Sequence, residues 1–240
     1  MKRKFQAAKG FTLLEVLVVI AVLAALLFSA VGTAKSKARR TACLSNLRQI
    51  CLGVNLYAGD SADAAPGGWS QTNSAFTYFQ GGVTAYKKLL GSDATPNLFA
   101  CPADTFHYDY LTNNPGYAYV PAGLHQQSGS DFSSYGFNGG DLLIFGTNTP
   151  SIAGRKLASI REPAKTVLVA DYAAFFPYSW HEPRKSSSNE PGLFQDAKNM
   201  VGFVDGHINY IRIFWDNSRR GDFGLVYEPP AGYDYKWSGD

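Results

Sequence analysis

The sequence predicts an α+β protein in which a long N-terminal helix packs on an antiparallel β-sheet. Three observations predict this fold. A continuous apolar run extends from Phe11 to Val31. Apolar residues at helical spacing then continue as far as Ala58. From residue 69 to 240, aromatic residues, glycines and short β-like runs dominate, with turn residues between them.

The apolar run is long enough to cross a membrane. As a helix, Phe11–Val31 spans about 31 Å, which matches a hydrocarbon core of about 30 Å. The apolar core of a secretory signal peptide is shorter, about 7 to 15 residues, although Gly32-Thr33-Ala34 would suit cleavage at small residues. The length of the run alone is compatible with three interpretations: a cleaved signal, a plain signal anchor, and a retained helix with a further role.

Glu15 separates these alternatives, because it places a carboxylate inside the apolar run. On insertion scales a charged residue costs about 2.5 to 3.5 kcal/mol at the helix centre, and less near an end. Such a residue normally has a partner, and its own helix offers none after Phe11. A free amino group at Phe11 of a neighbouring chain would be a suitable cation, and it requires cleavage between Gly10 and Phe11.

The basic leader followed by Gly10, Phe11 and Glu15 resembles the class III signal of type IV pilins and type II secretion pseudopilins. The motif is specific: a glycine, a phenylalanine, a glutamate as the fifth mature residue, and then the apolar helix. In that family a prepilin peptidase cuts after the glycine and methylates the new N-terminal phenylalanine. The resemblance implies that Gly10 and Phe11 flank the cleavage site, that Phe11 is N-methylated, and that Glu15 forms an assembly salt bridge with the Phe11 amine of a neighbouring subunit.

The same resemblance implies a pilin-like fold and a structural role as a filament subunit, most closely a type II secretion pseudopilin, and not an enzyme. The implied partners are prepilin peptidase, other pilin or pseudopilin subunits in a homo-oligomeric filament, an inner-membrane assembly platform and the lipid bilayer. The subunit would be a single-pass protein of the cytoplasmic membrane with its head in the periplasm, and part of a periplasmic or extracellular filament after assembly. The alternatives are a periplasmic carbohydrate-binding module, either secreted by a cleaved signal or membrane-anchored, and a membrane-anchored enzyme.

The apolar pattern predicts that the helix continues beyond the membrane run. Breakers such as Gly59 and Pro66 would end it, so the helix runs from about Phe11 to Ala58 and is about 70 Å long. We expect a basic leader (1–10), a transmembrane and filament-core helix (11–33), an amphipathic continuation (34–60) and a globular α+β head (61–240). The expected core positions are Ala38, Cys43, Leu44, Leu47, Cys51, Val54 and Ala58, with Arg40, Asn46, Arg48 and Gln49 facing outward.

The head contains several candidate strands, two of them rich in valine and isoleucine. Asp205-Gly206 has the composition of a hairpin turn, and residues 179–192 have the polar, proline-containing composition of a long loop. The candidate strands are residues 116–121, 141–146, 166–172 and 207–214, and short helices are expected at 84–91 and 154–160.

Segments of the head resemble a large pseudopilin-like family typical of planctomycete and verrucomicrobial-type bacteria. Many members carry a histidine followed nine residues later by Asp-Gly. Here His181 precedes Asp205-Gly206 by a much longer stretch, which fits an insertion in the loop after His181. The resemblance supports fold and filament class but implies no ligand. The segments that carry it are CLSNLRQICLGVNLYAGDSADAAP (43–66), FACPAD (99–104), YGFN (135–138), EPAKTVLVAD (162–171) and FVDGH (203–207).

The charge of the chain is concentrated beside the apolar run. The net charge is +3, but four of the 22 basic residues precede Gly10, and the remaining 18 face 19 acidic residues. A dense basic cluster follows the run, at Lys35, Lys37, Arg39 and Arg40. Basic clusters beside a membrane segment meet anionic lipid head groups, so we interpret this one as a membrane-surface anchor and expect no nucleic acid partner.

The three cysteines match no zinc pattern in their spacing. Cys43 and Cys51 share the predicted helix about 12 Å apart, too far for a disulfide. Cys101 can pair with either of them. We take Cys51–Cys101 as the candidate disulfide, and three unpaired thiols are an equal alternative.

A candidate metal site consists of Asp171, Asp205 and His207, which flank the two strongest strand candidates, with His181 nearby as a further candidate. Several oxygen or nitrogen ligands must converge in such a site. Calcium is the implied ion, because major pseudopilins of type II secretion bind it in a C-terminal loop. The chain lacks an acidic loop with clear ligand spacing, and we expect no other cofactor.

We predict no catalytic residues. The sequence contains neither a Gly-x-Ser-x-Gly elbow nor a His-Glu-x-x-His pattern, and its serine pairs, Gly129-Ser130 and Ser133-Ser134, lie in a predicted loop. Aromatic residues make up 14% of the chain, and we interpret most of them as ordinary core and rim residues, with a sugar-binding platform or subunit contacts as the alternatives. The residues in question are Trp69, Tyr78, Phe79, Trp180, Trp215 and Trp237.

Overall fold

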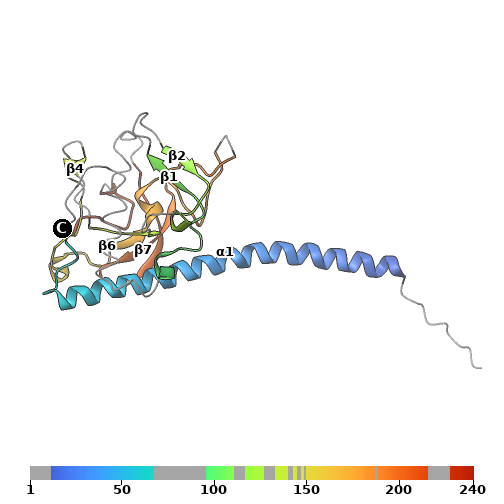
Figure 1. Ribbon diagram of the computed structural model, residues 1–240, viewed down its shortest axis with the longest axis horizontal. Coiled ribbons are helices and arrows are strands. Elements are labelled where there is room, and N and C mark those ends of the chain that lie inside the picture. The colour runs from blue at the N-terminus through green and yellow to red at the C-terminus, as the bar shows by residue number, and fades with distance from the viewer. Residues whose placement is uncertain are drawn as a thin grey trace, which may run out of the picture. The chain divides into compact units, whose positions relative to one another are not determined.

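The fold is α+β, as the sequence predicts, with one long N-terminal helix and antiparallel sheets (Figure 1). The chain divides into two compact units, one ending at Ala38 and one running from Arg39 to Asp240. The computed structural model describes residues 12–67, 96–110, 117–126, 133–139, 143–144, 147–148, 150–186, 189–215 and 228–240.

Helix α1 (Leu13–Asp60) confirms the predicted continuous helix. Its C-terminal end is set by a turn: the Ala58 carbonyl accepts hydrogen bonds from the Ser61 and Asp63 amides, at 3.0 and 2.8 Å. Ala62 and Asp63 both have positive φ, which no helix tolerates. Gly59, expected to end the helix, lies inside its last turn instead.

The main sheet of the second unit is antiparallel, with strand order β3-β6-β7-β8. Its strands are β3 (Tyr135–Phe137), β6 (Val167–Asp171), β7 (Lys198–Phe203) and β8 (Ile208–Arg212). Two smaller antiparallel pairs join β1 (His107–Tyr110) to β2 (Tyr117–Val120) and β4 (Leu143–Ile144) to β5 (Thr147–Asn148). Short 3₁₀ turns complete the described elements: η2 (Pro96–Phe99), η3 (Leu124–Gln126), η4 (Leu157–Ser159) and η5 (Tyr172–Phe175).

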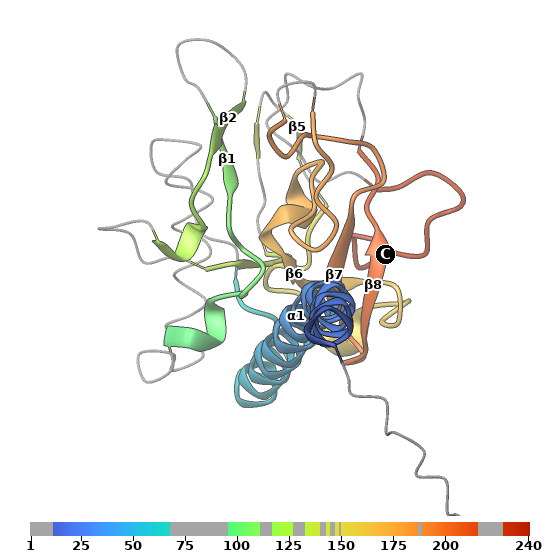
Figure 2. The same cartoon turned by 90° about the vertical axis from the view of Figure 1, so that its right-hand side faces the viewer.

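The core of the head forms where the C-terminal part of α1 packs against this sheet. Figures 1 and 2 show β6 and β7 beside that part of the helix. Gly202 of β7 allows the close approach, since a Cβ there would lie 2.2 Å from the Cys51 sulfur. The helix side of this core consists of Cys43, Leu47, Ile50, Cys51, Val54 and Ala58, all buried. These include five of the seven expected core positions; Ile50 was not predicted, Leu44 is half-buried and Ala38 is exposed.

A second apolar cluster includes Val167, Ala170 and Val201 of β6 and β7 and is closed by Tyr235 and Trp237 near the C-terminus. The Val167 amide donates to the Lys236 carbonyl at 2.9 Å, which fixes the C-terminal segment beside β6. All five residues of β6 are consequently buried. Burial of both faces explains why residues 167–170 of β6 are all apolar, with no polar alternation.

Two helix residues expected to face outward are held by the head. The Arg40 guanidinium contacts Glu182 at 2.9 Å and lies over the Tyr210 ring at 3.7 Å from its centroid. The Asn46 amide donates to the carbonyls of Asn97 and Ala100, at 3.4 and 3.1 Å. Both side chains are half-buried, so the prediction that they face outward is wrong. Their polar tips reach partners on the head while the rest of each side chain packs against it.

Candidate functional site

The N-terminal site is a reciprocal hydrogen-bonded pair at the start of α1. Glu15 Oε2 accepts hydrogen bonds from the Thr12 amide at 2.8 Å and from the Thr12 hydroxyl at 2.9 Å. The Glu15 amide lies 3.3 Å from the same hydroxyl. This geometry is a capping box, in which a threonine and a glutamate three residues later satisfy the free amides of a helix start. The Thr-x-x-Glu spacing in the sequence is itself a signal for this capping box.

The other residues of this site are Gly10 and Phe11, which lie outside the described residues. The Glu15 carboxylate is exposed, and within the described residues Thr12 supplies both of its hydrogen bonds. Its charge has no described cation beside it. A helix start also carries partial positive charge, which favours a carboxylate at this position.

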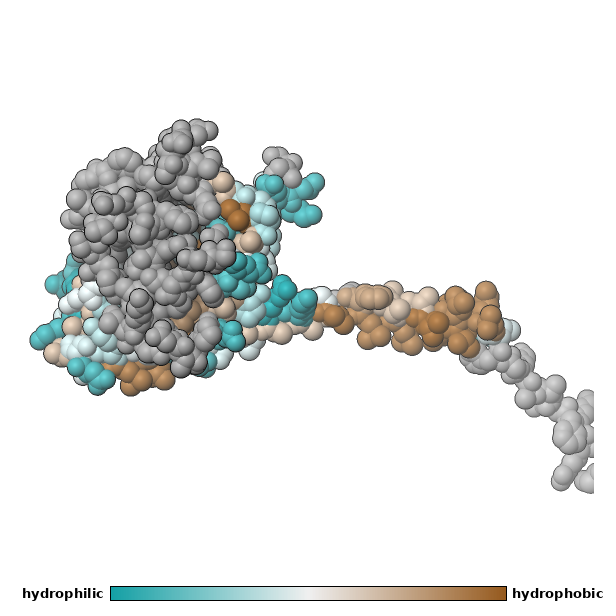
Figure 3. Space-filling model, in the orientation of Figure 1, coloured by the Kyte–Doolittle hydropathy of each residue, from teal (hydrophilic) through white to brown (hydrophobic). Residues whose placement is uncertain are grey.

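On the face drawn in Figure 3, the first part of α1 presents mainly apolar side chains. Its large apolar residues from Leu13 to Val31 are all exposed, Leu13 to the extent of 85%. Among the described residues, α1 is the one helix that is long and apolar enough to cross a membrane. An apolar surface of this extent needs lipid or other helices around it, because water solvates it poorly.

The structure separates the three residues of the predicted metal site. Asp205 and His207 lie in the β7–β8 turn and contact each other, Oδ1 to Nδ1, at 2.6 Å. Asp171 lies at the opposite end of β6, since it is Val167 that pairs with Phe203 beside that turn. Four residues of strand separate the two positions by about 13 Å. The set of Asp171, Asp205 and His207 is therefore not a single site in this structure.

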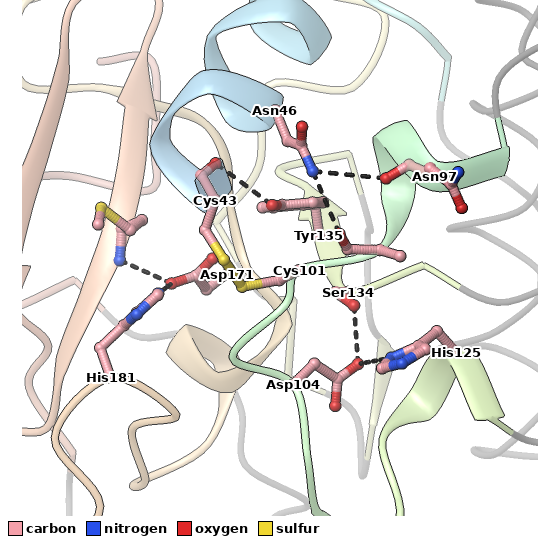
Figure 4. The surroundings of a disulfide bond; sticks show 12 residues. Cys43, Asn46, Asn97, Cys101, Asp104, His125, Ser134, Tyr135, Asp171 and His181 are labelled. Atoms are coloured by element: carbon pink, nitrogen blue, oxygen red, sulfur yellow. Dashed lines mark hydrogen bonds and ion pairs between the residues drawn. A yellow bond between two sulfur atoms is a disulfide. The ribbon is translucent and has the colours of Figure 1, made fainter. Parts of the chain in front are cut away.

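The disulfide joins Cys43 to Cys101, with Cα atoms 5.0 Å apart (Figure 4). The predicted Cys51–Cys101 pairing is wrong, because Asn46 holds residues 97–100 near the level of Cys43 on the helix. Cys51 lies two turns further along, buried under Gly202. Burial raises the pKa of the Cys51 thiol to about 12, so it stays protonated and unreactive at neutral pH.

Two buried carboxylates flank the disulfide, and sequence reasoning missed one of them. Asp104 Oδ2 accepts a hydrogen bond from the Ser134 hydroxyl at 2.7 Å and lies 3.5 Å from His125 Nδ1. In a hydrolase triad the histidine stands between serine and carboxylate. Here the carboxylate stands between serine and histidine, so the arrangement does not activate the serine.

The second carboxylate, Asp171, meets His181, as Figure 4 shows. Asp171 Oδ2 lies 3.2 Å from His181 Nε2 and also accepts the Met200 amide at 2.9 Å. Of the four polar residues considered for a metal site, the structure thus brings Asp171 and His181 together and leaves Asp205 and His207 as a separate pair.

The described tryptophans belong to the core. Trp180, Trp215 and Trp237 are all buried, and the Trp180 ring nitrogen donates to the Phe106 carbonyl at 2.6 Å. Their burial favours the structural interpretation over an exposed sugar-binding platform. Trp69, Tyr78 and Phe79 lie outside the described residues, as does the expected helix at 84–91.

Comparison with known protein families gives a match at the N-terminus. Residues 6–31 match the model of the prokaryotic N-terminal methylation motif. The match supports a type IV pilin-like subunit processed by prepilin peptidase. It also fits a single-pass anchor in the inner membrane and assembly with other pilin subunits. No curated protein and no solved structure matches the chain.

Proposed function

We propose that this chain is a pseudopilin of a type II secretion filament, cut after Gly10 and N-methylated on Phe11. The observation that carries the proposal is the match of residues 6–31 to the N-terminal methylation motif. The motif accounts for the basic leader and the apolar helix together. It points to a structural subunit rather than an enzyme.

Glu15 is the assembly residue in this proposal. In the single chain its carboxylate is held by the Thr12 amide and hydroxyl and stays exposed. Both donors are neutral groups, and the described residues place no cation beside the negative charge. The methylated amine of Phe11 in a neighbouring subunit supplies that counter-ion, and a charge pair gains strength inside an apolar bundle. The capping box thus keeps the carboxylate oriented until a neighbour arrives.

The proposed location of the head is the periplasm. The Cys43–Cys101 disulfide supports it, since disulfides persist in oxidising compartments and are rare in the cytosol. The basic residues after the membrane run support a position next to lipid head groups. Arg40 is the exception, because it is engaged by Glu182 and Tyr210.

The proposed subtype is the pseudopilin-like family of planctomycete and verrucomicrobial-type bacteria. The segments that carry this resemblance are far apart in the sequence. Cys43 of the first segment and Cys101 of the second form the disulfide, and Asp104, Tyr135 and Asp171 lie around it in Figure 4. Their convergence on one cluster supports the subtype.

The experiment that tests processing is the N-terminal sequence and intact mass of the protein from native membranes. We expect Phe11 at the terminus, carrying one added methyl group. A terminus at Lys35 would instead indicate an ordinary signal peptide and overturn the filament proposal. An intact Met1 in cells with an active prepilin peptidase would do the same and leave a simple anchor.

Assembly is tested by Glu15→Val. We expect normal membrane insertion but at least a tenfold loss of sheared filaments, because the neighbour's amine loses its partner. Thr12→Val is the matched control: it removes a capping hydroxyl but keeps the carboxylate, so filaments should largely persist. Equal loss in both variants would show that Glu15 acts only as a helix cap, and normal filaments from Glu15→Val would exclude the intersubunit pair.

A further inference from the structure

The Cys43–Cys101 disulfide is surrounded by side chains that can bind a metal ion and that a covalent link does not require. A ring nitrogen of His181 and the two sulfur atoms lie within 4.8 Å of one another. Asp171 Oδ2 lies 3.2 Å from His181 Nε2. The four side chains come from α1, the segment after η2, the end of β6 and the loop that follows η5, and Figure 4 shows them near one another.

Two polar atoms of this cluster are buried without a hydrogen bond. The side chains of Asp171 and His181 are 0% and 2% exposed. Within the described part of the chain, Asp171 Oδ1 and His181 Nε2 have no hydrogen bond, although Nε2 makes the 3.2 Å ion-pair contact with Asp171 Oδ2. Buried polar atoms are nearly always satisfied, so a buried imidazole without a hydrogen bond at Nε2 and with a ring nitrogen within 4.8 Å of two sulfurs points to a ligand. An imidazole nitrogen and a carboxylate oxygen are both metal donors.

We propose that the reduced form of this protein binds a Zn²⁺ ion through Cys43, Cys101 and His181, with the Asp171 carboxylate beside the imidazole. Two thiolates and an imidazole supply three positions of a tetrahedral zinc site, and water takes the fourth position in zinc sites with three protein ligands. The ligands come from distant parts of the sequence, which is why cysteine spacing alone showed no zinc pattern. The site is independent of the filament proposal, because none of its residues lies in the N-terminal motif.

The disulfide and the zinc site exclude each other, since they use the same two sulfurs. A dithiol reductant transfers two electrons and two protons to the disulfide, giving the thiols of Cys43 and Cys101, and is itself oxidised to a disulfide. Zinc binding then releases the two thiol protons and leaves the ion bound to two thiolates. In either form the same residues join α1 to the segment after η2.

The donor set selects the metal. Calcium takes six to eight oxygen ligands, whereas this cluster offers one carboxylate in a buried position. Thiolate sulfur favours zinc and similar soft ions over calcium, magnesium or manganese. The site therefore differs in both residues and ion from a calcium loop at the C-terminus.

The test is a Co²⁺ titration of the full chain in detergent micelles, after reduction with a phosphine and desalting without oxygen. We expect one equivalent of cobalt, with thiolate charge-transfer absorption and tetrahedral d–d bands that Zn²⁺ abolishes. The disulfide-bonded wild type has the same sequence and should bind none. Cys101→Ser should remove the bands, and His181→Ala should weaken binding more than tenfold.

Two matched controls separate the folded site from ligation by an unfolded chain. Cys51→Ala removes the third cysteine and His207→Ala removes an exposed histidine, and both should leave the bands unchanged. Circular dichroism of each sample reports folding. Absence of stoichiometric thiolate bands in the reduced wild type would overturn the proposal. Bands that persist in His181→Ala at unchanged affinity, or that depend equally on Cys51, would also overturn it.

Discussion

Asp104 shows how one buried carboxylate organises its neighbours. It accepts the Leu124 amide at 3.1 Å and the Ser134 hydroxyl at 2.7 Å, and it faces His125. The hydrogen bond and charge of Asp104 raise the pKa of His125 above its usual range near 6.5. The network therefore ties the η3 turn to the segment that enters β3.

Asp104→Asn should lower the pKa of His125 toward its ordinary value, because the negative partner is removed while the side-chain shape is kept. An NMR titration of the histidine ring protons measures this, with His107, His181 and His207 as internal references. Because the folded-state pKa is raised, the stability that this pair contributes is fully present below about pH 6.5 and is lost as the pH rises through the folded value. The difference in unfolding free energy between the wild type and Asp104→Asn should therefore become smaller as the pH rises. A His125 pKa that is unchanged in the variant would contradict the pairing of His125 with Asp104.

At the scale of elements, the contact between α1 and β7 depends on a glycine. Gly202→Ala would place a methyl group 2.2 Å from the Cys51 sulfur, against a well-packed interface. We expect a loss of about 1 to 3 kcal/mol in unfolding free energy, as for other overpacked cores. Chemical denaturation measures the loss, and Gly59→Ala is the control, since nothing lies within 4 Å of a Cβ there and alanine favours helix.

A double variant identifies the cause of that loss. Cys51→Ala removes the sulfur that the new methyl group would meet, so the two substitutions together should cost less than the sum of the single ones. Simple additivity would show that Gly202 matters through backbone conformation and not through the close approach of helix and strand.

The elements that the sequence predicts well are those with a local cause. Residues 166–172 and 207–214 are rich in valine and isoleucine and contain β6 and β8, and Asp205-Gly206 forms the turn before β8, with Gly206 at a φ of +91°. Strand β7 was missed because Gly202 and Asn199 have low β-propensity. Both are present for tertiary reasons: Gly202 admits the helix, and the Asn199 amide binds the Tyr178 carbonyl at 3.0 Å.

At the scale of the whole molecule, the N-terminal site was predictable and the cluster in the head was not. The N-terminal motif is contiguous, so the leader, Glu15 and the apolar run can be recognised together in the sequence. The family match, at residues 6–31, lies in the same part of the chain. The cluster around the disulfide depends on how Asn46, β6 and the loop after η5 bring distant residues together. Cys43 and Cys51 are both buried positions on one helix, so periodicity alone could not identify which of them forms the disulfide with Cys101.

The disulfide should contribute to the stability of the whole head, because it closes 58 residues of chain between α1 and the segment after η2. Replacing Cys43 and Cys101 by alanine frees the unfolded chain from this link, and we expect a loss of about 2 to 4 kcal/mol. Urea denaturation in micelles with a chelator should show a lower midpoint and a steeper slope, since an unlinked unfolded chain exposes more surface. The core shared by α1 and the sheet should keep the transition cooperative. A midpoint equal to that of the wild type would mean that this core alone, without the covalent link, holds α1 on the sheet.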